Sequence, residues 1–223
     1  MVSFAGVDEL YGAAAELWRR LNAGTELRLL GGLAVRAHVG DMARLTRDVD
    51  VVAMNVTIRE AVLALLRSEG RVTSGIGGWI RAVDPRDPRK PIIDVAAHPI
   101  CNPKTFEELS LAPEPDIIAV AGFDFPVADR VDLLRLKLAA GRGQDLVDVV
   151  LLSAFAIDAK TAAQRCARDD SERPVARGAN LARMELHDGG LSATFQEVMG
   201  RPMTNDETLS VGKLLEALRA EGL

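Results

Sequence analysis

Apolar residues along the first third of the chain switch between a helical and a strand-like spacing. Leu10, Ala14, Leu17 and Leu21 recur every three or four positions, as on one face of an amphipathic helix. The pattern from there predicts, in order, a helix at 8–21, a strand at 26–30, a Gly31-Gly32 turn, a helix at 33–39, a strand at 48–54 and a helix at 57–69 with Thr57 as its N-cap. Strands and helices in this order indicate an α/β or α+β domain.

The middle of the chain predicts two antiparallel hairpins, and the remainder predicts helices. The hairpins join residues 79–83 to 91–97 through a Pro-rich, charged loop, and 117–121 to 123–127 through Gly122. Helical periodicity covers 129–140, 145–155, 158–167, 191–199 and 205–220, and the polar residues 168–180 predict a mobile connector. We therefore expect an α+β fold with a small mixed β-sheet flanked by helices. Its α/β core spans 1–128, and a helical region at 129–223 packs on that core.

Composition and charge narrow the class of protein. The 223 residues are 48% hydrophobic, enough for a full core, and the longest apolar stretches, such as 146–156, are far too short to cross a bilayer roughly 30 Å thick. We expect a cytoplasmic protein with no membrane partner. Cys101 and Cys166 lack the spacing of a zinc site, and we expect both to be reduced. The net charge of −5 argues against gripping long nucleic acid by general electrostatics, and the charged residues around 84–88 predict a solvated loop.

Asp48 and Asp50 are the most informative pair of polar residues. On a strand, alternate side chains point to the same face, so these acids project together with Cα atoms about 6.6 Å apart, while Val49 and Val51 enter the core. Two carboxylates that face one point suggest a hard cation, and Mg²⁺ binds to one or two carboxylates together with substrate phosphates. The pair therefore predicts a magnesium site, with Mn²⁺ as the alternative ion.

A third carboxylate and a glycine pair extend this site. Asp94 lies between β-favouring apolar residues on a later strand, and it joins the same site if that strand lies beside the first. Gly31 and Gly32 precede a helix, so phosphate oxygens can approach their backbone amides and the positive end of that helix. In isolation the glycine pair indicates a tight strand-to-helix turn, but the acidic pair downstream favours phosphate binding.

Two segments resemble motifs of a known superfamily. Gly31-Gly32-x-Ala34-x-x-x-His38, followed by Arg44-x-Thr46-x-Asp48-x-Asp50, resembles the signature of minimal nucleotidyltransferases. The segment 136–148, Leu-Lys-Leu-Ala-Ala-Gly-Arg-Gly-Gln-Asp-Leu-Val-Asp, resembles the lysine-to-aspartate helical motif of the abortive-infection toxin branch of that superfamily. The second match is weaker, because Gln144-Asp145 stands where the family often has Arg-Asp.

The resemblance implies an enzyme that transfers a nucleoside monophosphate from a nucleoside triphosphate, such as ATP, to an acceptor with Mg²⁺. The implied metal ligands are Asp48, Asp50 and Asp94, which are also the implied catalytic residues together with Lys137. The implied nucleotide-binding residues are Gly31, Gly32, Arg44, Thr46 and Lys137. Asp94 is further implied to help deprotonate the acceptor, which is a tRNA, a small molecule or a protein. A toxin of this kind would have an antitoxin partner.

Several of these residues also have a purely structural interpretation. Lys137 lies on an apolar helix, where a lysine usually extends its amine to water. Asp145 is a good N-cap candidate, and with Asp148 it would complement the positive end of its helix by about 0.3–1 kcal/mol. Arg44 can pair with a phosphate or with an aspartate of the site. The roles of Arg142, Asp145 and Asp148 stay open.

Other functions use the same residues. Asp48-Val49-Asp50 also matches the Asp-x-Asp motif of glycosyltransferases, but those enzymes need most of a nucleotide-binding domain before the motif, and fewer than fifty residues precede it here. The main alternative is a noncatalytic nucleotide-binding or regulatory protein of the same fold, against which the complete set of three acids argues. A phosphohydrolase would leave the glycine pair unexplained.

Overall fold

The computed structural model describes residues 6–76, 78–102, 105–169 and 173–223, which fall into two compact units. The first unit contains the chain up to Ala37 together with Leu45–Asp129, and the second contains His38–Arg44 together with Arg130–Leu223. The sequence pattern does not indicate that residues 38–44 belong with the helical part. The predicted boundary after residue 128 and the packing of the helical region on the core stay predictions. Within the described residues, no helix is both long and apolar enough to cross a membrane.

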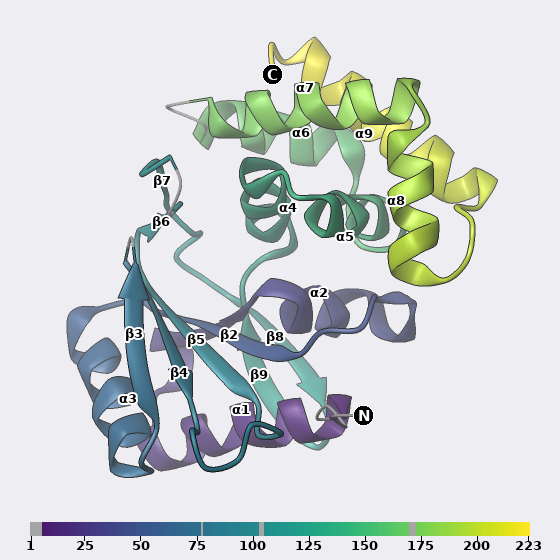
Figure 1. The fold of residues 1–223 in the computed structure, drawn as a ribbon. Coiled ribbons are helices and arrows are strands. Elements are labelled where there is room, and N and C mark those ends of the chain that lie inside the picture. The colour runs from purple at the N-terminus through teal and green to yellow at the C-terminus, as the bar shows by residue number, and fades with distance from the viewer. Residues whose placement is uncertain (1–5, 77, 103–104, 170–172) are drawn as a thin grey trace. The chain divides into compact units, whose positions relative to one another are not determined.

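The first unit is built on a seven-stranded mixed β-sheet, counted over the described residues (Figure 1). Its strands lie in the order β3 (Val72–Ile76), β4 (Trp79–Val83), β5 (Ile92–Ala97), β2 (Asp48–Ala53), β1 (Leu27–Leu30), β9 (Phe123–Val127) and β8 (Asp116–Val120). The pairs β2–β5 and β1–β9 are parallel, and the other neighbours are antiparallel. Two short strands, β6 (Ile100–Cys101) and β7 (Glu108–Leu109), pair separately. Both predicted hairpins, β4–β5 and β8–β9, are confirmed.

The helices of this unit pack on the sheet through a buried apolar and aromatic core. Helices α1 (Val7–Leu21) and α3 (Val56–Ser68) contact β2 and each other, and α2 (Gly31–Val39) follows β1 directly. A short 3-10 turn lies at Gly24–Glu26, and another at Gly40–Met42 belongs to the second unit. Phe125 of β9 is completely buried, with its ring centroid 5.6 Å from those of Tyr11 and Trp18 on α1. This aromatic cluster fixes α1 against β9, the strand beside β1.

Three sequence predictions for this unit are wrong in detail. Strand β3 was not predicted, because residues 72–76 carry polar side chains and a glycine and become a strand only by pairing with β4. The N-cap of α3 is Asn55 and not Thr57, since the Asn55 side chain accepts a hydrogen bond of 2.9 Å from the Ile58 amide. Helix α2 begins at Gly31, two residues before the predicted start at residue 33, although Gly31 itself has a positive φ of 64°.

The second unit is helical. Its helices are α4 (Arg130–Ala140), α5 (Gly143–Phe155), α6 (Ala159–Asp169), α7 (Pro174–His187), α8 (Gly190–Met199) and α9 (Asn205–Ala220). Helix α5 contacts α4, α8 and α9, and its residues 145–153 are all buried, Asp145 and Asp148 among them, as expected for a central helix. The connector predicted at 168–180 is wrong outside 170–172, which lie beyond the described residues. Helix α7 begins at Pro174, a residue that suits the first turn of a helix. Its Val175 and Ala179 are fully buried, so packing stabilises this helix in spite of its polar sequence.

Gly178 allows α7 to approach α4 closely. A Cβ atom at this position would lie 1.9 Å from the backbone carbonyl oxygen of Leu138, which is far inside van der Waals contact. Leu138 is fully buried and follows Lys137 on α4, a residue of the predicted site. The spacing of α4 and α7 therefore depends on the absence of a side chain at position 178.

We expect Gly178→Ala to lower the free energy of unfolding by about 1–3 kcal/mol, because the methyl group forces the two backbones apart. Gly212→Ala on α9 is the matched control, since no heavy atom lies within 4 Å of a Cβ built there. The control should raise the free energy of unfolding by about 0.5–1 kcal/mol through helix propensity alone. Urea unfolding of both variants measures the difference, and a neutral or stabilising Gly178→Ala would contradict the close packing.

Candidate active site

Three aspartates meet on neighbouring strands of the sheet. The parallel register of β2 and β5 sets Asp50 opposite Asp94, and Asp48 lies two positions earlier on the same face of β2. One carboxylate oxygen from each residue lies within 4.8 Å of the other two. The intervening Val49 and Val51 are fully buried, as predicted. The strand with Asp94 therefore lies beside the strand with Asp48 and Asp50, which was the condition for a shared site.

Gly31 lies directly against this cluster. Its φ angle is +64°, a conformation that favours glycine, and a Cβ atom there would lie 1.8 Å from Oδ2 of Asp50. The cause is the pairing of β1 with β2, which sets Leu30 opposite Asp50 and makes Gly31 the next residue along. A side chain at position 31 would thus occupy the space that the Asp50 carboxylate uses.

Arg81 of β4 is the cation beside the three acids. It lies opposite Asp94 in the β4–β5 register, and its Nε and Nη2 donate hydrogen bonds of 2.9 and 2.6 Å to the two oxygens of that carboxylate. The same Nη2 lies 3.5 Å from Oδ2 of Asp48. The hydrogen bond to Asp94 raises the pKa of Arg81, and the charges of Asp94, Asp48 and Asp50 raise it further against the opposing effect of burial. One guanidinium thus contacts Asp94 and Asp48, and the charge of Asp50 acts on it as well.

Thr46 also belongs to the first unit and lies near the cluster. Its side chain is buried, with Oγ1 3.5 Å from Oδ1 of Asp48, which is longer than a normal hydroxyl hydrogen bond. The contact is close enough to limit the positions that the Asp48 carboxylate can adopt.

Lys137 lies in a second cluster of charged residues, within the helical unit. Its Nζ is 3.1 Å from Oδ1 of Asp145 and 2.7 Å from Oδ2 of Asp148, and the Lys137 side chain is 7% exposed. Arg44 donates from Nε and Nη2 to the two oxygens of Asp148, each at 3.0 Å. Arg142 donates to both oxygens of Asp145, at 2.5 and 3.2 Å. These five residues form one ion-pair network.

The contacts and pKa shifts in this network show which structural interpretation holds for Lys137, Asp145 and Arg44. Burial lowers the pKa of Lys137, but Asp148 and Asp145 raise it by more, so its pKa is raised overall. Burial likewise raises the pKa of Asp145, and Lys137 and Arg142 more than reverse that shift. Lys137 does not extend its amine to water, and the N-cap of α5 is Arg142 and not Asp145. Arg44 pairs with an aspartate, Asp148 of the helical unit.

The predicted site residues are thus divided between the two units. The first unit brings together Asp48, Asp50 and Asp94 with Gly31 and Thr46, and Gly32 is buried in the first turn of α2. The second unit brings together Arg44 and Lys137 through their shared partner Asp148.

Sequence reasoning missed Arg81 as a site residue and left Asp145 and Asp148 without a role. The predicted hairpin of 79–83 with 91–97 contained the signal for Arg81, since an antiparallel register that opposes residues 81 and 94 places both side chains on one face. The spacing of Asp145 and Asp148 by three residues puts them on one side of a helix, where a single lysine can meet both.

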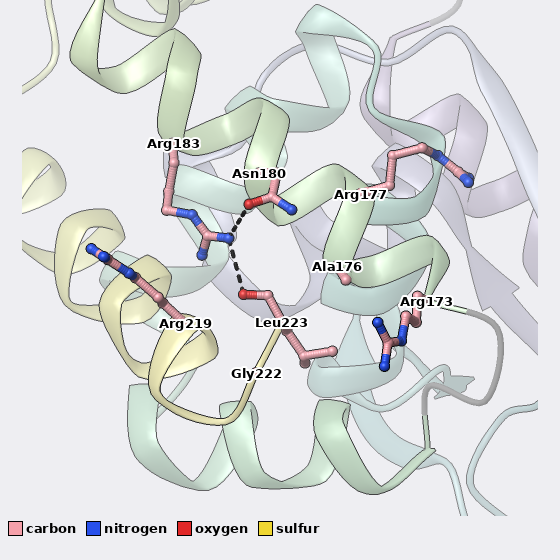
Figure 2. Close-up of a pocket in the computed structure, with 8 residues that line it drawn as sticks. All are labelled: Arg173, Ala176, Arg177, Asn180, Arg183, Arg219, Gly222 and Leu223. Carbon is pink, nitrogen blue, oxygen red and sulfur yellow. Dashed lines mark hydrogen bonds between the residues drawn. The ribbon is translucent and has the colours of Figure 1, made fainter.

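Two other charged surfaces contain none of these residues. In the loop after β4, Arg86 and Lys90 pair with the buried Asp84, which agrees with the predicted solvated loop. In the helical unit, a cavity of about 820 Å³ is lined by Arg173, Ala176, Arg177, Asn180, Arg183, Arg219, Gly222 and Leu223 (Figure 2). Arg183 there donates to Asn180 and to the Leu223 carbonyl, while the Arg177 and Arg219 guanidinium groups point away from one another.

The three acids on the sheet suit a divalent metal ion. Their donors are carboxylate oxygens, which Mg²⁺ and Mn²⁺ prefer, whereas zinc sites are built mainly from nitrogen and sulfur. Because Gly31 has no Cβ atom, the Asp50 carboxylate has room to lie beside those of Asp48 and Asp94. The cluster can therefore hold one hard cation, and the Asp48 side chain, which is 33% exposed, is open to water.

The chain is similar in structure to several solved proteins. An antigenic nucleotidyltransferase-like protein from Paracoccidioides brasiliensis shares the fold with a TM-score of 0.51 and 16% identity, over 87% of this chain and 98% of that one. JHP933 from Helicobacter pylori gives 0.48 and 16%, over 99% and 95%, and ANT(2″)-Ia in complex with adenylyl-2″-tobramycin gives 0.45 and 14%, over 87% and 97%. No curated protein sequence matches this chain significantly.

The family assignment comes from the sequence itself. Residues 16–217 match the family described as "Nucleotidyl transferase AbiEii toxin, Type IV TA system". The match covers most of the chain, including the three acids on the sheet and the Lys137 network, and it confirms the resemblance found in the two motifs. It also favours nucleotidyl transfer over glycosyl transfer for the Asp-x-Asp segment. The chain belongs to the AbiEii nucleotidyl transferase toxin family.

Proposed function

We propose that this protein transfers a nucleoside monophosphate from a nucleoside triphosphate to an acceptor with the help of Mg²⁺. The observation that carries the proposal is the cluster of Asp48, Asp50 and Asp94, whose carboxylate oxygens lie within 4.8 Å of one another. The family supports the class of reaction, and the oxygen-only donor set supports magnesium. The proposed partners are a nucleoside triphosphate, a tRNA as the first acceptor to test, and an antitoxin.

In the proposed reaction, an acceptor oxygen forms a bond to the α-phosphorus while the bond from that phosphorus to the pyrophosphate oxygen breaks. Asp48, Asp50 and Asp94 hold the metal, which when bound supplies positive charge for the departing pyrophosphate. The acceptor's proton is assigned to Asp94. In this structure each oxygen of Asp94 accepts a hydrogen bond from Arg81, so Arg81 competes with the acceptor group for that carboxylate.

Two sets of residues are assigned to phosphate. Helix α2 begins at Gly31, so its first amides and its positive end can receive phosphate oxygens beside Asp50. Lys137 is assigned to phosphate by its place in the helical motif of the family. Asp145 and Asp148 support this role because they keep its pKa raised, so the lysine remains a cation in spite of its burial.

We expect the double variant Asp48→Asn, Asp50→Asn to lose magnesium-dependent binding of nucleoside triphosphate, by a factor on the order of a hundred or more, because two of three metal ligands lose their charge. Calorimetry with ATP, GTP, CTP and UTP in MgCl₂ measures the loss and identifies the donor. Asp124→Asn is the matched control, since Asp124 is an exposed acid on β9 of the same sheet.

Transfer is followed in the same samples with triphosphates labelled at the α-phosphorus and with purified tRNA. Label that reaches tRNA with the parent and the Asp124→Asn control, but not with the double variant, supports the proposal. Binding of a triphosphate without label transfer to tRNA, small-molecule or protein fractions would favour the noncatalytic alternative. Equal binding by the parent and the double variant would refute the metal site.

We expect Lys137→Met to lower the free energy of unfolding by about 3–5 kcal/mol at pH 7, because Asp145 and Asp148, 1% and 0% exposed, lose a buried cationic partner. The lowered pKa of Asp145 in the folded state means that its stabilising effect is present above its ordinary pKa and is lost as the pH falls through the lowered value. The difference between parent and variant should therefore shrink below about pH 4.

Urea unfolding of the parent and the variant at several pH values measures both effects. Lys160→Met, the same substitution at an exposed lysine of α6, should change the free energy of unfolding by less than about 0.5 kcal/mol. If Lys137→Met were as stable as this control at pH 7, the buried network would not have the role assigned to it.

A further inference from the structure

Arg81 lies beside the three acids, where its positive charge offsets the repulsion between their carboxylates. In the register of β2, β5 and β4, Asp50, Asp94 and Arg81 form one row across three strands, with their side chains on one face. The guanidinium binds both oxygens of Asp94 and reaches Asp48 at 3.5 Å. Two of the three proposed metal ligands are therefore already in contact with a positive charge of the protein itself.

The exposure of Arg81 distinguishes this ion pair from the buried pairs of the chain. The Arg81 side chain is 52% exposed, whereas the Lys137 side chain is 7% exposed and held by two fully buried acids. A half-exposed arginine can swing its guanidinium into water at little cost, because water replaces the hydrogen bonds that it gives up. Asp94 and Asp48 would then lose their contacts with this positive charge and repel one another more strongly, which favours another cation in its place.

We propose that Arg81 is an exchangeable counter-cation of the metal site, which holds Asp94 and Asp48 before metal and nucleotide arrive and then moves to the phosphates. This inference rests on the proposed metal site and assigns a regulatory and positioning role to a residue outside the ligand set. Metal ion alone must compete with the guanidinium for Asp94. Metal ion that arrives with a triphosphate also brings acceptor oxygens for the released guanidinium, which forms bidentate pairs with phosphate.

This exchange of Arg81 couples the binding of the metal ion to the binding of the nucleotide. Arg81 weakens the binding of a bare divalent ion, because two positive charges compete for one carboxylate at short range. The same residue strengthens the binding of the metal–nucleotide complex. The site would therefore remain without metal until the substrate is present, and its acids would meanwhile stay neutralised and in register.

Arg81→Met tests this coupling, since methionine keeps an apolar chain of similar reach and removes the charge. Titration of Mn²⁺ alone, followed by calorimetry and by the paramagnetic resonance signal of free Mn²⁺, should show a dissociation constant about tenfold lower in the variant than in the parent. For the nucleoside triphosphate that the parent binds best in MgCl₂, the dissociation constant should instead rise about tenfold. Opposite shifts in these two constants are the expected signature.

Two further variants separate charge from geometry. Arg89→Met removes the same charge from the exposed pair of Arg89 with Asp87 in the same unit, and it should leave both constants unchanged. Arg81→Lys keeps the charge without the two-pronged geometry, so its Mn²⁺ constant should lie between those of the parent and Arg81→Met. In thermal unfolding, MgCl₂ should raise the midpoint of Arg81→Met by more than that of the parent, which shows that the variant is folded and that the metal replaces the lost cation.

The outcomes distinguish this inference from the proposed function. Equal Mn²⁺ constants for the parent, Arg81→Met and Arg89→Met, together with loss of binding in Asp48→Asn, Asp50→Asn, would refute the exchange while leaving the metal site intact. If neither the parent nor Arg81→Met binds Mn²⁺, the metal site itself fails, and this inference fails with it. A fall in Mn²⁺ affinity on Arg81→Met would also overturn the inference, because it would make Arg81 a support of the site and not a competitor.

Discussion

The parallel pairing of β2 with β5 is the constraint on which the candidate site depends. Alternation along one strand is enough to place Asp48 and Asp50 on a common face, but Asp94 joins them only through the register that sets it opposite Asp50. A slip of one residue would turn Asp94 to the other face of the sheet. The flanking Ile93 and Val95 oppose such a slip, since both are buried and a slip would turn them to the face on which the acids lie.

The strands next to β2 and β5 position the rest of the site. Strand β1 runs antiparallel to β2 and ends with Leu30 opposite Asp50, so the first residue of α2 necessarily comes close to that carboxylate. Only a glycine fits there, because a Cβ atom would overlap with Oδ2 of Asp50. On the other side β4 brings Arg81 to Asp94. Gly31, which has no side chain, and Arg81, which has a positive charge, thus allow the three acids to lie close together.

The two units handle their charged clusters in different ways. On the sheet, the three carboxylates lie beside the half-exposed guanidinium of Arg81. In the helical unit, Asp145 and Asp148 are buried against Lys137, which is itself almost fully buried. A half-exposed ion pair contributes little to stability, whereas loss of one partner from a buried network leaves an uncompensated charge.

Local patterns were enough to predict much of this protein. The sequence by itself determined most of the helices, the two hairpins, the common face of Asp48 and Asp50, and the family, because periodicity, turn residues and motif spacing act between near neighbours. Only the tertiary structure decided that Asp94 lies opposite Asp50, that Arg81 pairs with Asp94, and that Lys137 is buried between Asp145 and Asp148. It also decided that residues 72–76 form a strand and that α7 begins at Pro174. These features depend on which segments pair and in what register, and that choice is made by packing between residues distant along the chain.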